Sequence, residues 1–178
     1  DEMPYESSRY RDMTPASRRQ FADAFLQALD EVVASFSPDL ILCHHLYLLT
    51  ALVREHLPRH RIYGFCHNTD LRQMVKTDLE RDFIRHQIRR LDRIFVPQLS
   101  QQEEVRRIFG VEEEKIRQIG IGYNQEIFSS GKKEDKRNES ACSCDEKRLI
   151  FAGKISEKKG VFSLLRALAL LAKKGERF

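Results

Sequence analysis

The sequence predicts an α/β protein in which helices cover both faces of a parallel sheet. Short apolar runs alternate with longer amphipathic stretches along much of the chain, the pattern of consecutive βαβ units. The apolar runs are continuous, as expected for parallel strands that are covered on both sides. Right-handed crossovers would join these strands into a doubly wound sheet. With 178 residues and 41% hydrophobic content, the chain can form a core.

In the first half of the chain, the sequence predicts two helices and two strands. A helix is expected from about Pro15 to Phe36, because apolar residues recur along one face. Pro38 and Asp39 break this pattern before a strand at Leu40–Cys43. A helix over residues 46–57 and a strand at Ile62–Cys66 complete this half.

The next stretch repeats the alternation twice. Helical patterns begin near Leu71 and again near Leu79, and the strand Arg93–Pro97 follows them. Ser100 and Glu103 have the spacing of a capping box, and Gly110 is expected to end that helix. We expect Asp70 to cap the helix that opens at Leu71. A fourth strand is predicted at residues 115–119.

A change of composition divides the chain into two predicted domains. Residues 129–146 are almost devoid of apolar side chains, which predicts a linker or exposed loop. The strand Leu149–Ala152 and the helix Val161–Ala172 follow it. We therefore expect a first domain over residues 1–128, a polar linker over 129–147, and the first strand-helix unit of a second, incomplete domain over 148–178.

Composition excludes several classes of protein. The 31 basic and 27 acidic residues give a net charge of +4, which does not demand nucleic acid as a partner. No apolar run is long enough for a membrane span, and no signal peptide or metal-ligand spacing is present. Cys43 and Cys66 are expected to be buried free thiols, and Cys142 and Cys144 to be incidental. These features favour the cytoplasm.

A candidate phosphate site lies between the last predicted strand and helix. Gly153 and Gly160 would let the backbone approach a ligand closely, and Lys154 and Lys159 would add positive charge near the first helical turn. From these residues alone, an ordinary turn with solvated lysines explains the pattern equally well.

Six segments occur in an order that resembles the group-one glycosyltransferases, the family usually numbered four. The resemblance spans most of the chain and implies the GT-B fold, which has two Rossmann-like domains with the active site in the cleft between them. The segments are Asp39-Leu-Ile-Leu-Cys-His-His45, Cys66-His-Asn-Thr-Asp70, Asp92-Arg-Ile-Phe-Val96, Val111-Glu-Glu-Glu-Lys-Ile116, Gly122-Tyr-Asn-Gln-Glu-Ile-Phe128 and Phe151-Ala-Gly-Lys-Ile-Ser-Glu-Lys-Lys-Gly160.

The resemblance assigns His67 to the catalytic site, near the transferred sugar, although Asn68 stands where the family often has glycine. The same position follows from the sheet, because ligands gather beyond the carboxyl ends of parallel strands. A hydrogen-bonded turn histidine is the alternative for His67. His44, His45, Asp70 and Arg72 are weaker candidates for the acceptor side, since packed, capping or solvated side chains are the usual roles of such residues.

The resemblance also implies that Lys154 and Lys159, with Gly153 and Gly160, bind the donor diphosphate. Lys154 replaces an arginine of the family motif, so it keeps the charge but loses the bidentate fork. The donor would be a UDP-, GDP- or ADP-sugar, used as a substrate without a bound cofactor or metal. The anomeric configuration would be retained, and the leaving phosphate would accept the acceptor's proton.

Acceptor identity and oligomeric state are not indicated by the sequence. We expect the chain by itself to be inactive, because family motifs at both ends of the enzyme are not found in it. A noncatalytic nucleotide- or sugar-phosphate-binding module and a sugar-nucleotide epimerase are the alternatives. Arg81, Arg85 and Arg89 form a helical stripe that could touch lipid headgroups at the inner face of a membrane, or could be a solvated helix face diluted by Glu80, Asp82 and Asp92.

Overall fold

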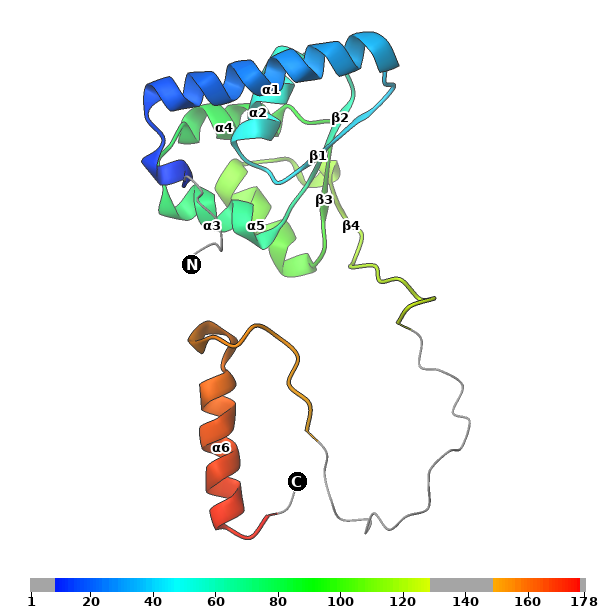
Figure 1. The fold of residues 1–178 in the computed structure, drawn as a ribbon. Coiled ribbons are helices and arrows are strands. Elements are labelled where there is room, and N and C mark those ends of the chain that lie inside the picture. Colours follow the sequence, from blue (N-terminus) through cyan, green and yellow to red (C-terminus); the bar gives the residue numbers. More distant parts are fainter. Residues whose placement is uncertain (1–8, 129–148, 177–178) are drawn as a thin grey trace. The chain divides into compact units, whose positions relative to one another are not determined.

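The computed structural model describes residues 9–128 and 149–176 (Figure 1). The chain forms two compact units, Asp1–Tyr123 and Asn124–Phe178. The predicted linker over residues 129–147, including Cys142 and Cys144, lies outside the described residues. Each unit is described by itself below.

The first unit is built on a four-stranded parallel sheet, which confirms the α/β class. The strands follow one another in the order β1-β2-β3-β4. In register, Cys43 lies opposite Gly64, and Gly64 lies opposite Ile94. The strands are β1 (Ile41–His44), β2 (Ile62–Phe65), β3 (Arg93–Val96) and β4 (Ile116–Gln118).

Five α-helices and two short 3₁₀ helices are described in this unit. The longest, α1, has the predicted bounds because local signals fix its start: the Thr14 side chain accepts a hydrogen bond from Ser17 N, and Pro15 occupies the first turn. Figure 1 shows α1 beside α2. The elements are η1 (Tyr10–Asp12), α1 (Pro15–Phe36), α2 (Leu48–His56), α3 (Asn68–Lys76), α4 (Arg81–Arg89), α5 (Leu99–Phe109) and η2 (Glu113–Lys115).

Side-chain burial is complete on only one face of the sheet within the described residues. Ile62, Ile94 and Val96 are fully buried, whereas Phe65 and Phe95 on the other face are only half-buried. This differs from the predicted cover on both faces. Strands in sequential order joined by right-handed crossovers place their connecting helices on the same face, which accounts for the difference.

Gly64 allows the segments that flank α2 and α4 to approach the sheet closely. A Cβ atom at this position would lie 2.6 Å from Leu46 Cδ2 and 2.9 Å from Leu91 Cδ1. Both leucines are fully buried members of the core. A larger residue at position 64 would therefore force the core to move, at a free-energy cost of about 1–3 kcal/mol.

Two predicted helix starts are wrong. The α5 helix begins at Leu99, after the extended residue Gln98, so Ser100 lies inside the first turn and does not form the predicted capping box. The α3 helix begins at Asn68, with His67 as its N-cap, and Asp70 is the third helical residue. In both cases the chain leaves the preceding strand and enters the helix earlier than the local pattern indicates.

The second unit contains the 3₁₀ helix η3 (Glu157–Lys159) and α6 (Val161–Lys173). The predicted buried strand at residues 149–152 is not formed, and Ile150 is 93% exposed. A strand needs a neighbour to pair its backbone groups, and the part of this unit that is described contains no other strand. The helix α6 has no buried residue.

Two further sequence predictions concern the core and the membrane. Cys66 is a buried free thiol, as predicted, whereas Cys43 is only half-buried. Among residues 9–128 and 149–176, no helix has both the length and the apolarity that a bilayer span requires.

Candidate functional site

Three histidines gather where β1 and β2 end. His44 is the last residue of β1, His45 follows it, and His67 comes two residues after β2. Because these strands are parallel neighbours, their carboxyl ends meet at one edge of the sheet. His44 Nδ1 lies 3.1 Å from His67 Nε2, and the rings of His45 and His67 are 4.5 Å apart. These residues are the histidine cluster.

The backbone at His45 explains how two consecutive histidines both reach His67. Successive side chains of a regular strand point to opposite faces, but His45 has a φ of 69°, in the left-handed region. Its N–H donates to Phe65 O at 3.0 Å, and its carbonyl accepts from Thr50 Oγ1 at 2.6 Å. The surrounding structure thus holds the chain in a conformation that a non-glycine residue rarely adopts.

Asp70 connects the two turns that carry the histidines. Its buried carboxylate accepts hydrogen bonds from Leu46 N at 2.7 Å and His67 N at 2.9 Å. A further bond comes from Leu71 N at 3.0 Å. Asp70 therefore acts as a positioning residue that fixes the geometry of the histidine cluster.

The environment favours a neutral His67 side chain. Burial lowers the pKa of His67 below its ordinary value, and the neighbouring His45 lowers this pKa further, while Asp70 opposes the shift. A neutral imidazole has one nitrogen that donates and one that accepts a hydrogen bond. Next to it, burial and the Asp70 carboxylate raise the pKa of the Cys66 thiol, so this cysteine remains protonated.

A pocket of about 280 Å³ opens beside the histidine cluster. Tyr10 and Tyr47 form one part of its wall, with their rings 4.8 Å apart in an edge-to-face arrangement. The lining contains one carboxylate, from Asp70, which is occupied by backbone N–H groups, and it contains no lysine or arginine among the described residues. The remaining lining residues are His44, His45, Leu49, Thr69 and Gln73.

The structure separates the sequence-predicted site residues into groups. His44, His45, His67 and Asp70 come together, whereas Arg72 lines a different hollow on the outer side of α3. Asn68 lies in the first turn of α3, where its non-glycine side chain is accommodated. Within the described part of the chain, no three His, Cys, Asp or Glu side chains are arranged to hold a metal ion.

Sequence reasoning missed Tyr10, Tyr47, Thr69 and Gln73 as lining residues. Thr69 and Gln73 lie one turn apart on α3 and could have been found from helical spacing after His67. No local signal points to Tyr10, because it reaches the pocket only through tertiary packing against Tyr47.

The residues predicted to bind phosphate lie in the second unit. Gly160 ends η3 with a φ of 75° and directly precedes α6, so glycine suits this position. Its carbonyl accepts from Leu164 N at 2.9 Å, which begins the helical bonding of α6. Gly153, Lys154 and Lys159 occupy the segment that leads to this helix start.

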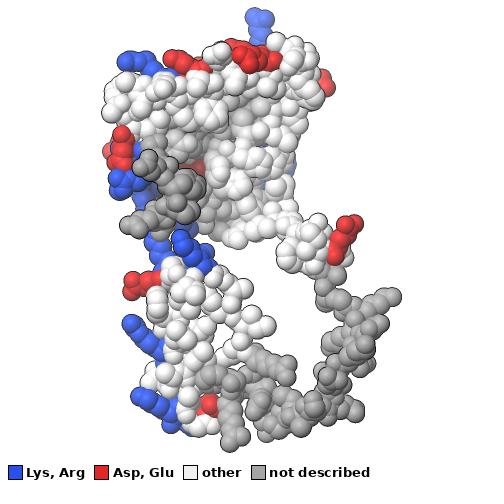
Figure 2. All heavy atoms as spheres, viewed as in Figure 1, with Lys and Arg blue, Asp and Glu red and all other residues white. Residues whose placement is uncertain are grey.

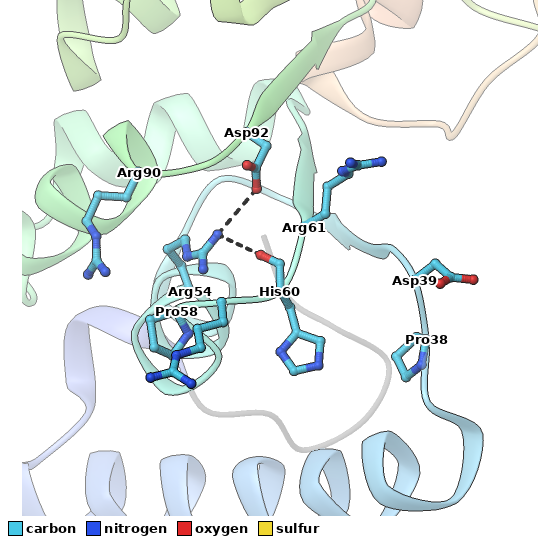
Figure 3. Close-up of a pocket in the computed structure, with 9 residues that line it drawn as sticks. Pro38, Asp39, Arg54, Pro58, His60, Arg61, Arg90 and Asp92 are labelled. Atoms are coloured by element: carbon cyan, nitrogen blue, oxygen red, sulfur yellow. Dashed lines mark hydrogen bonds and ion pairs between the residues drawn. The ribbon is translucent and has the colours of Figure 1, made fainter.

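A larger hollow, of about 660 Å³, lies at the opposite, amino ends of the strands (Figure 3). Its buried centre is Arg54, which donates to Leu57 O at 2.7 Å, to His60 O at 3.1 Å and to Asp92 Oδ2 at 3.3 Å. Figure 3 shows Arg61 and Arg90 pointing away from each other. These contacts tie a loop to the sheet, and the arginines do not converge on one point as an anion site would require.

A family model matches the larger part of the chain. The model of a family described as Glycosyltransferase Family 4 matches residues 4–126, which include the sheet, the histidine cluster and the neighbouring pocket. No curated protein matches the chain.

Proposed function

The chain belongs to Glycosyltransferase Family 4, and from this premise we propose that it serves a retaining transferase that moves sugar from a nucleotide-sugar donor to an acceptor. One observation supports the proposal most: a neutral histidine, His67, stands at the carboxyl edge of the parallel sheet beside a pocket. This edge is where ligands of open α/β sheets bind.

In the proposed reaction the bond between the anomeric carbon and the diphosphate oxygen breaks, and a bond from the acceptor oxygen forms on the same face of the sugar. The acceptor's proton passes to the leaving phosphate oxygen. Negative charge therefore grows on the diphosphate, and fixed cations aimed at it lower the barrier. Lys154 and Lys159 are proposed to supply this charge, while Gly153 and Gly160 give the phosphates room.

His67 is proposed to hold the transferred sugar in place. With a lowered pKa, its imidazole stays neutral near pH 7 and can share a hydrogen bond with a sugar hydroxyl. His44 contacts His67 directly and His45 lies against its ring, so both orient the imidazole from the acceptor side. No carboxylate nucleophile is needed, which agrees with the full use of the Asp70 oxygens by backbone N–H groups.

The pocket beside the histidine cluster is proposed to receive the acceptor. Its wall of tyrosine and histidine rings suits the flat, weakly polar face of a sugar ring or another uncharged group. We propose that residues 1–128 form the acceptor-side domain and that residues 148–178 begin the donor domain, in a protein that works in the cytoplasm.

The test is a reaction screen of the full-length protein with UDP-, GDP- and ADP-sugars and a mixed acceptor pool. Mass spectrometry would follow release of nucleoside diphosphate and formation of a glycoside with the donor's anomeric configuration. We expect His67→Gln and Lys159→Gln to lower acceptor-dependent turnover at least tenfold. A matched control is Lys115→Gln, because Lys115 contacts the Arg89 carbonyl away from the histidine cluster.

Two outcomes would reject transfer. Donors that bind but stay intact with every acceptor would indicate a noncatalytic binding module. Conversion of the donor sugar to an isomer without any acceptor would indicate an epimerase.

A further inference from the structure

A basic groove runs along the outer side of α3, between this helix and the helices α4 and α5. Two adjoining hollows, of about 200 and 280 Å³, share Val75, Arg107 and Ile108 and thus form one continuous surface. Five cationic side chains and one carboxylate, Glu104, line it. The cations are Arg72, Lys76, Arg81, Arg85 and Arg107.

Most of these cations have no acidic partner among the described residues. Arg81 pairs with Asp78 at 2.7 Å, but no ion pair is formed by Arg72, Lys76, Arg85 or Arg107 within residues 9–128 and 149–176. The Nε atom of Arg85 is buried without a hydrogen-bond partner in the same part of the chain. Guanidinium groups that no carboxylate neutralises can bind anions through strong, charge-assisted hydrogen bonds.

Three carboxylates neighbour the arginines of α4 in the sequence, and two of them form ion pairs with arginines outside α4. Glu80 pairs with Arg18 at 3.2 Å, and Asp92 accepts from Arg54 at 3.3 Å and from Ile62 N at 2.8 Å. Of these three acids, Asp82 alone forms no ion pair within residues 9–128 and 149–176. The stripe is therefore more strongly basic in the fold than in the sequence.

Apolar side chains accompany the charges. Val75, in the middle of the groove, is 62% exposed, and Ile108 and Leu71 lie along its floor. Figure 2 shows red Asp and Glu side chains along α1, with blue Lys and Arg side chains beside them. The basic groove thus combines positive charge with exposed apolar surface.

We propose that the basic groove docks on the surface of a membrane rich in anionic phospholipids. Several cations spaced along a groove match a layer of many headgroups better than one small anion, and exposed Val75 would sit at the level of the acyl chains. The inference does not require sugar transfer. It assigns an anionic membrane surface to the basic groove, and the pocket at the histidine cluster remains available for the acceptor.

The experiment measures binding of the chain to vesicles by co-sedimentation. Vesicles of phosphatidylcholine with about one third phosphatidylglycerol are compared with pure phosphatidylcholine at low ionic strength. Each cation near such a surface is worth about fivefold in partitioning, so the double variant Lys76→Gln/Arg107→Gln should bind roughly 25-fold more weakly. Both side chains are exposed, so folding is expected to survive, and circular dichroism would verify it.

The matched control is Arg19→Gln/Arg59→Gln, which removes the same charge from exposed positions outside the basic groove. It should keep binding within about twofold of the unmodified chain. Equal binding to both vesicle types, or an equal loss in the control, would overturn the proposal. Displacement of vesicle-bound protein by millimolar glycerol phosphate would instead assign the groove to free phosphate compounds and would also overturn it.

Discussion

Asp70 is the residue on which the local geometry of the histidine cluster depends most. Its two oxygens serve the N–H groups of Leu46 and His67, which come from different turns. Asp70→Asn would turn one acceptor oxygen into a donor that faces these N–H groups. We expect the free energy of unfolding to fall by about 2 kcal/mol or more, measured by urea denaturation.

The matched control for this prediction is Asp78→Asn. Asp78 pairs with Arg81, but its side chain is 89% exposed, and exposed pairs contribute at most about 1 kcal/mol. Equal losses in the two variants would show that the carboxylate of Asp70 does not hold the turns together.

His67 makes stability depend on pH. Burial lowers the pKa of His67 in the folded protein, whereas the unfolded chain has the ordinary value near 6.5. Below pH 6.5 the unfolded state therefore binds more protons, and the contribution of His67 to stability is lost as the pH falls through the folded pKa. The free energy of unfolding, measured by urea denaturation between pH 5 and 7.5, should depend less steeply on pH in His67→Gln than in the unmodified protein. An identical pH dependence in the two proteins would contradict the lowered pKa of His67.

At the scale of elements, the end of α5 shows how a glycine and an arginine act together. Gly110 has a φ of 69°, and a Cβ atom there would lie 2.6 Å from Arg89 Nη2. Arg89 Nε donates to Phe109 O at 2.6 Å. Gly110→Ala would thus combine backbone strain of about 1–2 kcal/mol with loss of a hydrogen bond worth about 1 kcal/mol.

Gly120→Ala is a control for Gly110→Ala, because it introduces the same backbone strain without a contact with Arg89. Gly120 has a φ of 76°, yet a Cβ atom there would meet nothing within 4 Å. We expect thermal denaturation to show the larger loss for Gly110→Ala. Equal losses would mean that Arg89 moves aside without cost.

At the scale of the whole molecule, burial is concentrated in one unit. All fully buried apolar residues that are described lie between Leu46 and Ile116, whereas α6 exposes Phe162, Leu165 and Leu170. Amide hydrogens should therefore exchange much faster in peptides from α6 than in peptides from β3 and α4, as measured by mass spectrometry. Equal protection would show that α6 is buried in solution.

The features that were predictable from sequence are those fixed by neighbours along the chain. Thr14 and Pro15 mark the start of α1, and the order of the strands places His67 beside His44 at the carboxyl edge. The Tyr10–Tyr47 contact and the position of Arg72 outside the pocket were not predictable, because they depend on how elements pack. The strand expected at residues 149–152 failed for a related reason: apolar composition favours a strand, but only a pairing partner forms one.

The tyrosine pair gives this protein a built-in optical reporter. The chain contains five tyrosines and no tryptophan, and Tyr10 and Tyr47 meet in the wall of the pocket. Tyr10→Trp would therefore place a single indole where an incoming molecule must touch it. Its emission could be excited without interference from any other tryptophan, so that occupancy of the pocket could be followed in real time without a synthetic dye.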